Sequence, residues 1–414
     1  MADKCEKLLN LLRAFAECIC ECDEKPTDPD PTDPEDPEDP DPTDPEDPED
    51  PEGPSTRLTG FYHASFTNEA GAMRLADVTD EWETVNIAFA VCPGDDGTIV
   101  FERDDAVVRI ESDEEFAAAV KAHQDRGAKV LLSLGGERGI VRLRSEADRD
   151  RFVSSIKNLV ETWGFDGIDL DFEGSLYLNR SDKDFENPTT PVIVNLIAAL
   201  RQLVEDLGED FTITMTPEVR SVQAAIEEYG ASGEEDDQMR GAYLPVIHAL
   251  RDIISQVNVQ HYNTDMITDA EGNEYAAGTA DFHVALVDLL IQGFPVGTTG
   301  QTFPGLDVSQ VGIALPATAD AAYSGFTESA TMVQALDVLT GKADPAEDGY
   351  VPAAAYEDLA GLTAWSVNWN RKADGEFTQA YGSYFSEDGT TDPVDPEDPE
   401  EPEEPGEPEP EPRL

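Results

Sequence analysis

The sequence predicts an α/β fold, a (β/α)8 TIM barrel placed between acidic tails. Eight short apolar runs alternate with stretches in which apolar residues recur every three to four positions, as on the buried face of a helix. Glycines stand where three of these helices should end, at Gly127, Gly164 and Gly208. An open doubly wound sheet is the alternative, but no Gly-x-Gly-x-x-Gly phosphate loop follows the first strand.

Four parts are expected along the chain: residues 1–25, 26–56, 57–386 and 387–414. The barrel is assigned to residues 57–386, and its helical periods are clearest at 152–163 and 192–207. The predicted strands are Leu58–Tyr62, Thr84–Ala90, Lys129–Leu134, Gly167–Phe172, Phe211–Thr216, Val257–Tyr262, Val311–Leu315 and Leu362–Ser366.

Residues 1–25 are predicted to form a short amphipathic helix that ends before Pro26. Its apolar residues have the three-four spacing of a coiled-coil seam, but fewer than three heptads are marginal alone. We therefore expect a possible oligomerisation or attachment segment. Cys18, Cys20 and Cys22 could cross-link chains in an oxidising compartment. A metal site is a weaker alternative, because a helix does not place these three sulfurs on one side; incidental cysteines on an amphipathic tail are another.

Two segments, residues 26–56 and 387–414, are predicted to be disordered. Their Asp/Glu/Pro repeats offer almost no apolar side chain to bury, lack a backbone donor at every proline, and repel along their length. Segment 26–56 should therefore be an extended spacer between the N-terminal helix and the barrel.

Acidic residues dominate the composition, with 89 Asp and Glu against 27 Lys and Arg and a formal net charge of −62. A folded domain with such an excess repels itself in dilute buffer, where the Debye length is about 30 Å at 0.01 M salt. We hypothesise a halophilic source. The charge also argues against nucleic acid and anionic membrane surfaces as partners.

The most informative stretch is residues 166–173, Asp-Gly-Ile-Asp-Leu-Asp-Phe-Glu. In a strand, Asp169, Asp171 and Glu173 share one face, and the intervening apolar residues line the other. Neighbouring carboxylates resist joint ionisation, so one of them should keep a proton near neutral pH, as a general acid must. A solvated acidic strand or a calcium loop is the alternative, but no glycine turn of the EF-hand kind follows.

This Asp-x-x-Asp-x-Asp-x-Glu pattern resembles the catalytic signature of glycoside hydrolase family 18, the chitinases and related endo-N-acetylglucosaminidases. Four further segments resemble that family in the same order, so that the likeness spans about residues 57–386. They are Lys129–Gly136, Thr214–Glu218, Val259–Asn263 and Gly361–Asn370.

The resemblance implies a role for each carboxyl. Glu173 would be the general acid and base, and Asp171 would steady the N-acetyl nitrogen while the acetyl oxygen attacks the anomeric carbon. Asp169 would share a proton with Asp171. Tyr262 would donate its hydroxyl to the acetyl carbonyl. Family 18 is an exception to the two-carboxylate scheme, so no second enzyme nucleophile is required, and two inversions give retention.

The resemblance also implies a sugar-binding surface around these groups. Trp365 would form its apolar floor, and Met215, Gln260 and Asn263 would line the same pocket. Thr264, where many relatives have a second asparagine, puts contacts beyond the cleavage point in doubt.

The implied function is that of a retaining endo-chitinase acting on β-1,4-linked N-acetylglucosamine polymers. About 45 residues separate the last two strands, too few for the extra α+β insertion of deep-cleft chitinases, which predicts a shallow groove and endo-type cleavage. An endo-β-N-acetylglucosaminidase acting on cell-surface or glycoprotein glycans is the alternative, and a non-catalytic glycan-binding relative ranks below both.

No cofactor or metal is expected, because the five histidines are single and scattered. No run of 18 apolar residues predicts a membrane span, and no secretory signal is legible at the N-terminus. Since the expected substrate lies outside cells, we nevertheless expect an extracellular or particle-associated enzyme.

Overall fold

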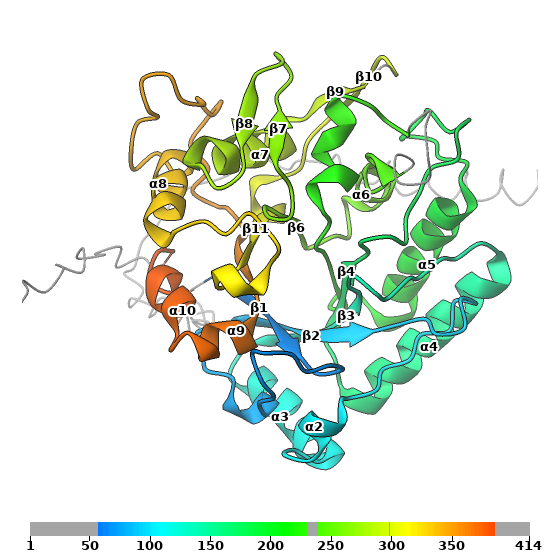
Figure 1. Ribbon diagram of the computed structural model, residues 1–414. Coiled ribbons are helices and arrows are strands. Elements are labelled where there is room, and N and C mark those ends of the chain that lie inside the picture. Colours follow the sequence, from blue (N-terminus) through cyan, green and yellow to red (C-terminus); the bar gives the residue numbers. More distant parts are fainter. Residues whose placement is uncertain (1–56, 231–238, 298, 386–414) are drawn as a thin grey trace, which may run out of the picture. The chain divides into compact units, whose positions relative to one another are not determined.

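The computed structural model describes residues 57–230, 239–297 and 299–385 (Figure 1). The predicted N-terminal helix, its cysteines and the two acidic tails lie outside the described residues. Within the described ranges, no helix is both long and apolar enough to cross a membrane.

Eight parallel strands close into a barrel in the order β1-β12-β11-β6-β5-β4-β3-β2, which confirms the predicted fold. Closure is made by β1 and β12, where Leu58 pairs with Leu362. The strands are β1 Leu58–His63, β2 Thr84–Ala90, β3 Lys129–Gly135, β4 Gly167–Asp171, β5 Thr212–Met215, β6 Gln256–Gln260, β11 Val311–Pro316 and β12 Gly361–Trp365.

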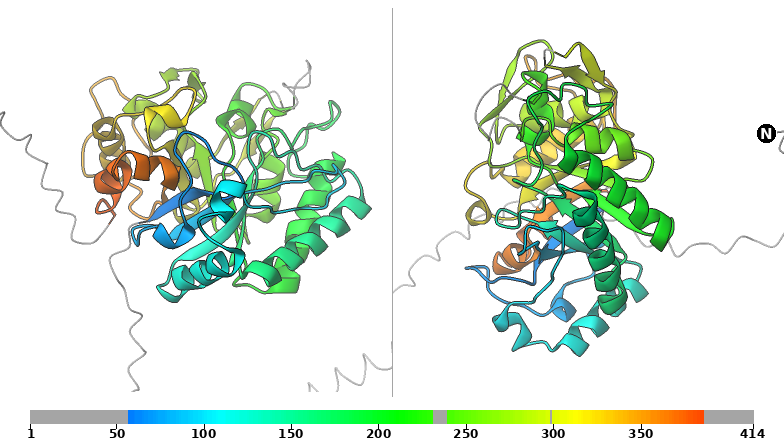
Figure 2. Two further views of the ribbon diagram at one scale, coloured as in Figure 1. Left: turned by 60° about the horizontal axis from the view of Figure 1, so that its bottom comes forward. Right: turned by 90° about the vertical axis from the view of Figure 1, so that its right-hand side faces the viewer.

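Helices surround the strands, and α4 and α5 lie side by side along one flank (Figures 1 and 2). Ser145 begins α4 with a capping box, and Gly164 ends it in the left-handed conformation that favours glycine. The helices are α2 Asp105–Val108, α3 Asp113–Asp125, α4 Glu146–Trp163, α5 Pro191–Leu207, α6 Leu244–Leu250, α7 Ala280–Gln292, α8 Ser329–Leu339, α9 Val367–Lys372 and α10 Glu376–Tyr381.

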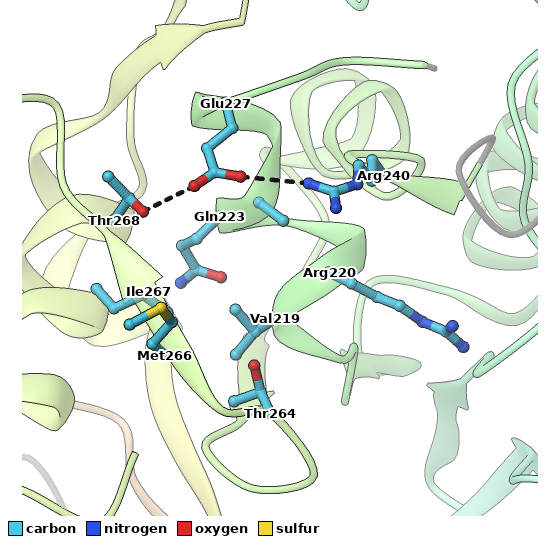
Figure 3. Close-up of a pocket in the computed structure, with 10 residues that line it drawn as sticks. Val219, Arg220, Gln223, Glu227, Arg240, Thr264, Met266, Ile267 and Thr268 are labelled. Carbon is cyan, nitrogen blue, oxygen red and sulfur yellow. Dashed lines mark hydrogen bonds and ion pairs between the residues drawn. The ribbon is translucent and has the colours of Figure 1, made fainter. Parts of the chain in front are cut away.

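Several small elements decorate the barrel and were not expected. Two antiparallel hairpins lie near α7 at the top of Figure 1, and 3-10 turns follow β5. The hairpins pair β7 Met266–Thr268 with β8 Glu274–Ala276, and β9 Phe294–Val296 with β10 Gln301–Phe303. The turns after β5 are η2 Val219–Ser221 and η3 Gln223–Ile226. Strands of three residues are too short to show the two-residue alternation that reveals a strand in a sequence.

The segment between β11 and β12 is described throughout. It contains a 3-10 turn, η6 Ala319–Ala321, and helix α8, and no strand occurs between β11 and β12. This agrees with the expectation that the chain lacks the α+β insertion between its last two barrel strands.

Candidate active site

The acidic row lies at the carboxyl end of β4, inside the barrel. Asp169 and Asp171 are buried on the strand itself, and Glu173 is half-buried two residues farther along. The intervening Ile168 and Leu170 are part of the hydrophobic core. Alternation along one strand therefore brings the three carboxyls together at the end of the barrel where enzymes of this fold carry their active sites.

Asp169, the deepest carboxyl, is held by three hydroxyl groups. Ser133 Oγ donates to its Oδ2 at 2.7 Å, and Thr214 and Thr216 donate to its Oδ1 at 2.8 and 2.9 Å. Burial raises the pKa of Asp169, and these three hydrogen bonds oppose that rise because they favour the charged form. Strands β3 and β5 thus supply the polar partners that a buried carboxyl requires.

Gln260, at the end of β6, connects the other two carboxyls. Its Nε2 lies 3.0 Å from Asp171 Oδ1 and 3.2 Å from Glu173 Oε1. Burial, followed by repulsion from Glu173, raises the pKa of Asp171 well above its usual range. Burial, followed by repulsion from Glu218, raises the pKa of Glu173 to about 7. Two carboxyls this close, beside a neutral amide and with no cation between them, favour a proton held within the pair.

Backbone contacts fix the strand that carries these carboxyls. The backbone N–H of Gly136 donates to the carbonyl of Asp171 at 2.7 Å. Gly135 has a φ of +107°, and a Cβ added there would lie 2.3 Å from the same carbonyl oxygen. The Ser-x-Gly-Gly segment therefore contributes one hydroxyl from Ser133 and two glycines that allow close backbone approach.

Tyr243, which no sequence pattern singles out, holds the same strand in place. Its hydroxyl donates to the carbonyl of Leu170 at 3.0 Å and accepts from the N–H of Phe172 at 2.9 Å. It is fully buried in the segment before α6. Nothing in the local sequence distinguishes it from an ordinary core tyrosine.

Trp365 lies at the end of β12 in a cluster of aromatic rings. Phe89 stacks against it with centroids 5.7 Å apart, Phe61 meets it edge-on at 5.4 Å, and His63 lies at 5.1 Å. Trp365 and Phe89 are half-buried, so part of this aromatic surface remains open to a ligand. Tyr62, by contrast, is fully buried and donates its hydroxyl to the carbonyl of Met73, which makes it a core residue.

Tyr262 lies close to the carboxyls, two residues beyond the end of β6. Burial, followed by the charges of Asp171 and Glu173, raises its pKa well above the usual value. Its hydroxyl therefore stays protonated at any physiological pH and can donate a hydrogen bond.

Two residues of the matched segments face away from the carboxyls. Met215 is fully buried in the hydrophobic core, whereas its neighbours Thr214 and Thr216 point inward to Asp169. Alternation thus places Met215 between the barrel and its helices, which differs from the expectation that it lines the sugar pocket. His261 is buried against α7, with its Nδ1 3.0 Å from Nδ1 of His283.

Asn263 holds the loop that follows β11. Its Oδ1 accepts hydrogen bonds from the backbone N–H groups of Tyr323 and Ser324, at 3.0 and 3.3 Å. Its Oδ1 therefore anchors a neighbouring loop, and the expectation that Asn263 lines the sugar pocket stays a prediction.

Tyr323 and Glu137 form a contact across the barrel mouth that the sequence did not indicate. Tyr323 is 85% exposed, and its hydroxyl lies 3.4 Å from Glu137 Oε1. Glu137 follows β3 and Tyr323 follows β11, strands on opposite sides of the barrel. Glu137 also contributes to the raised pKa of Glu173, so the contact lies near the acidic row.

Glu218 and Arg220 form an ion pair beside the acidic row. Arg220 Nε donates to Glu218 Oε2 at 2.9 Å, and its Nη2 donates to the backbone carbonyl of Glu173 at 2.8 Å. Glu218 ends the matched segment after β5, but the sequence assigned it no role. Arg220 thus helps to position the backbone of Glu173, and the charge of Glu218 helps to raise the pKa of Glu173.

Within the described ranges, His, Cys, Asp and Glu side chains form no group of three or more suited to hold a metal ion. The carboxyl oxygens of Asp169, Asp171 and Glu173 accept hydrogen bonds from hydroxyls and from one amide. This set of groups is suited to proton transfer and hydrogen bonding.

Comparison with known proteins gives consistent matches. The sequence model described as glycosyl hydrolases family 18 matches residues 57–283. Exochitinase 1 of Streptomyces olivaceoviridis is 45% identical over 338 residues, which cover 79% of this chain and 55% of that protein. A probable class II chitinase of Arthroderma benhamiae is 41% identical over 317 residues, 76% of this chain and 95% of that protein.

The crystal structure of a family GH18 chitinase from Chromobacterium violaceum superposes with a TM-score of 0.71 at 34% identity. The match covers 79% of this chain and 83% of that one. The chain thus spans nearly all of the Arthroderma relative but only slightly more than half of the Streptomyces one.

Proposed function

The chain belongs to glycosyl hydrolases family 18, and we propose that it is a retaining endo-chitinase that hydrolyses β-1,4-linked N-acetylglucosamine polymers by substrate-assisted catalysis. The observation that carries this proposal is the row of three carboxyls at the end of β4, in which Asp169 and Asp171 are buried and burial raises the pKa of the half-buried Glu173 to about 7. The chitinases among the relatives support the substrate class.

Glu173 is the proposed general acid and base. A catalytic group transfers protons best when its pKa lies near the working pH, and a carboxyl with a pKa of about 7 is substantially protonated at neutrality. It protonates the glycosidic oxygen, and the resulting carboxylate then activates the water that completes hydrolysis.

Asp171 and Tyr262 are proposed to act on the substrate's N-acetyl group. The carboxyl of Asp171 accepts from the acetamide N–H, and the hydroxyl of Tyr262 donates to the acetyl oxygen as that oxygen attacks the anomeric carbon. Because the substrate supplies the nucleophile, the enzyme needs no second carboxylate at bonding distance, and two inversions retain the anomeric configuration. Asp169, held by three hydroxyls, shares a proton with Asp171 and so tunes the charge of that carboxyl.

The aromatic cluster around Trp365 supports binding of a pyranose. The C–H faces of a sugar ring pack on an aromatic surface, and Trp365 is half-buried among Phe61, His63 and Phe89. We propose that this surface is the floor beneath the sugar whose bond is cleaved.

Endo-type cleavage is the finer part of the proposal. It rests on the segment between β11 and β12, which lacks the extra strands that would wall a deep groove. Cleavage of a soluble chitin polymer should therefore lower its viscosity early, before much disaccharide is released. Release of disaccharide with little change in viscosity would indicate exo-type cleavage instead.

The test is hydrolysis of a fluorogenic N-acetylchitooligosaccharide by the wild type and Glu173→Gln. We expect kcat of the variant to fall by about 10²- to 10⁴-fold, because the proton donor is lost while shape is kept. Glu102→Gln, at an exposed position, is the matched control. A folded wild type that is inactive on chitin oligomers would contradict the chitinase proposal and favour cleavage of glycoprotein glycans.

We also propose that the enzyme works in concentrated salt, outside the cell or on a particle. The net charge of −62 supports this, because added ions screen the repulsion among carboxylates. Activity and thermal stability should both rise as sodium chloride increases from dilute buffer to about 3 M. Full activity and stability in dilute buffer would contradict a halophilic origin.

A further inference from the structure

A cavity of about 420 Å³ lies beside the acidic row, between the turns after β5 and strand β7 (Figure 3). Val219 and Gln223 line one side of it, and Met266 and Ile267 line the other. The two sides come from parts of the chain about forty residues apart. Its volume is within the range of about 300–1,000 Å³ of small-molecule pockets.

The charged groups of this side pocket are paired with one another. Arg240 Nη1 lies 3.4 Å from Glu227 Oε2, and Thr268 donates to the other oxygen of that carboxylate at 2.7 Å. Arg220 is paired with Glu218. A ligand that fits this charge-balanced lining is polar and uncharged.

The remaining lining combines apolar surface with one unsatisfied acceptor. Met266 is 46% exposed, beside the buried side chains of Val219 and Ile267. Gln223 is only 2% exposed; its Nε2 donates to the carbonyl of Leu286, but its buried Oε1 has no partner among the described residues. Figure 3 shows its amide directed toward the space between η3 and β7. Buried polar atoms are rarely left unpaired, so a donor from a ligand would complete this site.

The side pocket is connected to the catalytic centre. Arg220, which lines it, donates to the backbone carbonyl of Glu173. Thr264, also in the lining, follows Tyr262 by two residues. The pocket therefore adjoins the catalytic centre through Arg220 and through the short segment from Tyr262 to Thr264.

We propose that this side pocket binds one uncharged sugar residue of the substrate that lies too far from the cleaved bond for a disaccharide substrate to reach it. Apolar surface from Met266 and Ile267 packs against a face of the pyranose ring, and Gln223 Oε1 accepts from a hydroxyl or acetamide N–H. The proposal rests on the proposed function, because it names where that same substrate extends.

Ala224→Phe is the first test, since this half-buried residue lines the pocket and a phenyl ring would fill it. We expect KM for the chitin hexasaccharide to rise about fivefold while KM for a fluorogenic disaccharide stays unchanged, because only the longer chain reaches the pocket. Gln223→Leu keeps the size of the side chain and removes the acceptor, and should shift the hexasaccharide alone in the same direction. Ala118→Phe, on the exposed face of α3, is the matched control.

Direct binding separates this proposal from the proposed function. Chitin hexasaccharide is titrated calorimetrically into Glu173→Gln with and without Ala224→Phe, and we expect about fivefold weaker binding when the pocket is filled. Unchanged binding, or folded variants that alter both kinetic substrates equally, would overturn the pocket assignment. A wild type that cleaves neither substrate but loses hexasaccharide affinity on Ala224→Phe would overturn the hydrolase proposal and keep the pocket.

Discussion

The acidic row inside the barrel and the side pocket at its rim are built in different ways. The row comes from one strand, β4, whose alternation places Asp169 and Asp171 on the same face, and neighbouring strands supply their hydrogen bonds. The side pocket is made by short turns and a three-residue strand, from segments far apart in the sequence. The row is therefore determined by regular geometry, whereas the pocket depends on loop packing.

This difference predicts that the row and the side pocket affect different kinetic properties. A group that acts on the reacting atoms should affect every substrate alike, whereas a group that contacts a distant sugar should affect only substrates long enough to reach it. Variants in the row should lower kcat for all substrates, and variants at the rim should change the ratio between long and short ones. Each prediction below tests one side of that comparison.

The largest effect in the comparison is expected for Asp171→Asn. We expect kcat to fall by about 10²- to 10³-fold on the disaccharide and the polymer alike, because the charge that steadies the reacting acetamide is lost. Steady-state kinetics on both substrates measures this. The asparagine keeps the size of the side chain and can still accept from Gln260, which separates charge from shape.

A fall confined to the polymer would contradict the assignment of Asp171 to the chemistry and would place it among the binding residues. Thermal unfolding of the same variant is the control for misfolding. Because Asp171 is buried beside Glu173 and Asp169, we expect the variant to be at least as stable as the wild type at neutral pH.

The acidic row should also make the free energy of unfolding depend on pH. Substitution of Ala224 in the side pocket should not change that dependence. The pKa of Glu173 rises from 4.5 to about 7 on folding, so the folded state binds more protons than the unfolded state between these values. Stability contributed by the protonated form is present below pH 4.5 and is lost as pH rises through about 7. The wild type should thus lose up to about 3 kcal/mol relative to Glu173→Gln between pH 4 and pH 8.

Urea unfolding of both proteins at the two pH values checks this prediction. Ala224→Phe at the rim adds no titratable group, so its difference from the wild type should be the same at both. A Glu173→Gln variant whose relative stability does not change with pH would show that Glu173 is not held in its protonated form by burial.

The sequence predicted the inside of the barrel well because its geometry is regular. Alternation alone placed Asp169, Asp171 and Glu173 on one face, and the eight predicted strands match the observed ones to within one or two residues at each end. Met215 is the exception inside the barrel. It was assigned to the pocket by resemblance, whereas the sequence Thr-Ile-Thr-Met of β5 alternates polar and apolar residues, and the contact of Thr214 with Asp169 shows that the threonine face points inward.

The rim was not predicted for a different reason. Asn263 has a φ of +53°, and its side-chain oxygen accepts from the backbone of Tyr323. The orientation of this side chain therefore depends on a residue that is sixty positions away in the sequence. Gln223 lies in a 3-10 turn without strand or helix periodicity. Contacts between such segments depend on tertiary packing and leave no local pattern to recognise.

The smallest effect is expected where the rim closes over the row. The Tyr323 hydroxyl contacts Glu137 across the barrel mouth, and we expect this contact to break when an internal segment of polymer enters. One exposed hydrogen bond is worth about 1 kcal/mol. Tyr323→Ala should therefore raise the rate on soluble chitin polymer relative to the fluorogenic disaccharide by about twofold to fivefold.

Tyr323→Phe separates the two possible roles of this side chain, because it keeps the ring and removes only the hydroxyl. If the hydrogen bond limits entry, Phe and Ala should raise the polymer rate alike. If the ring instead packs against a sugar, Ala should raise KM for the polymer while Phe remains close to the wild type. In that second case Tyr323 would be a substrate-binding residue, like those of the side pocket. The rim would then favour long substrates because it contacts their additional sugars.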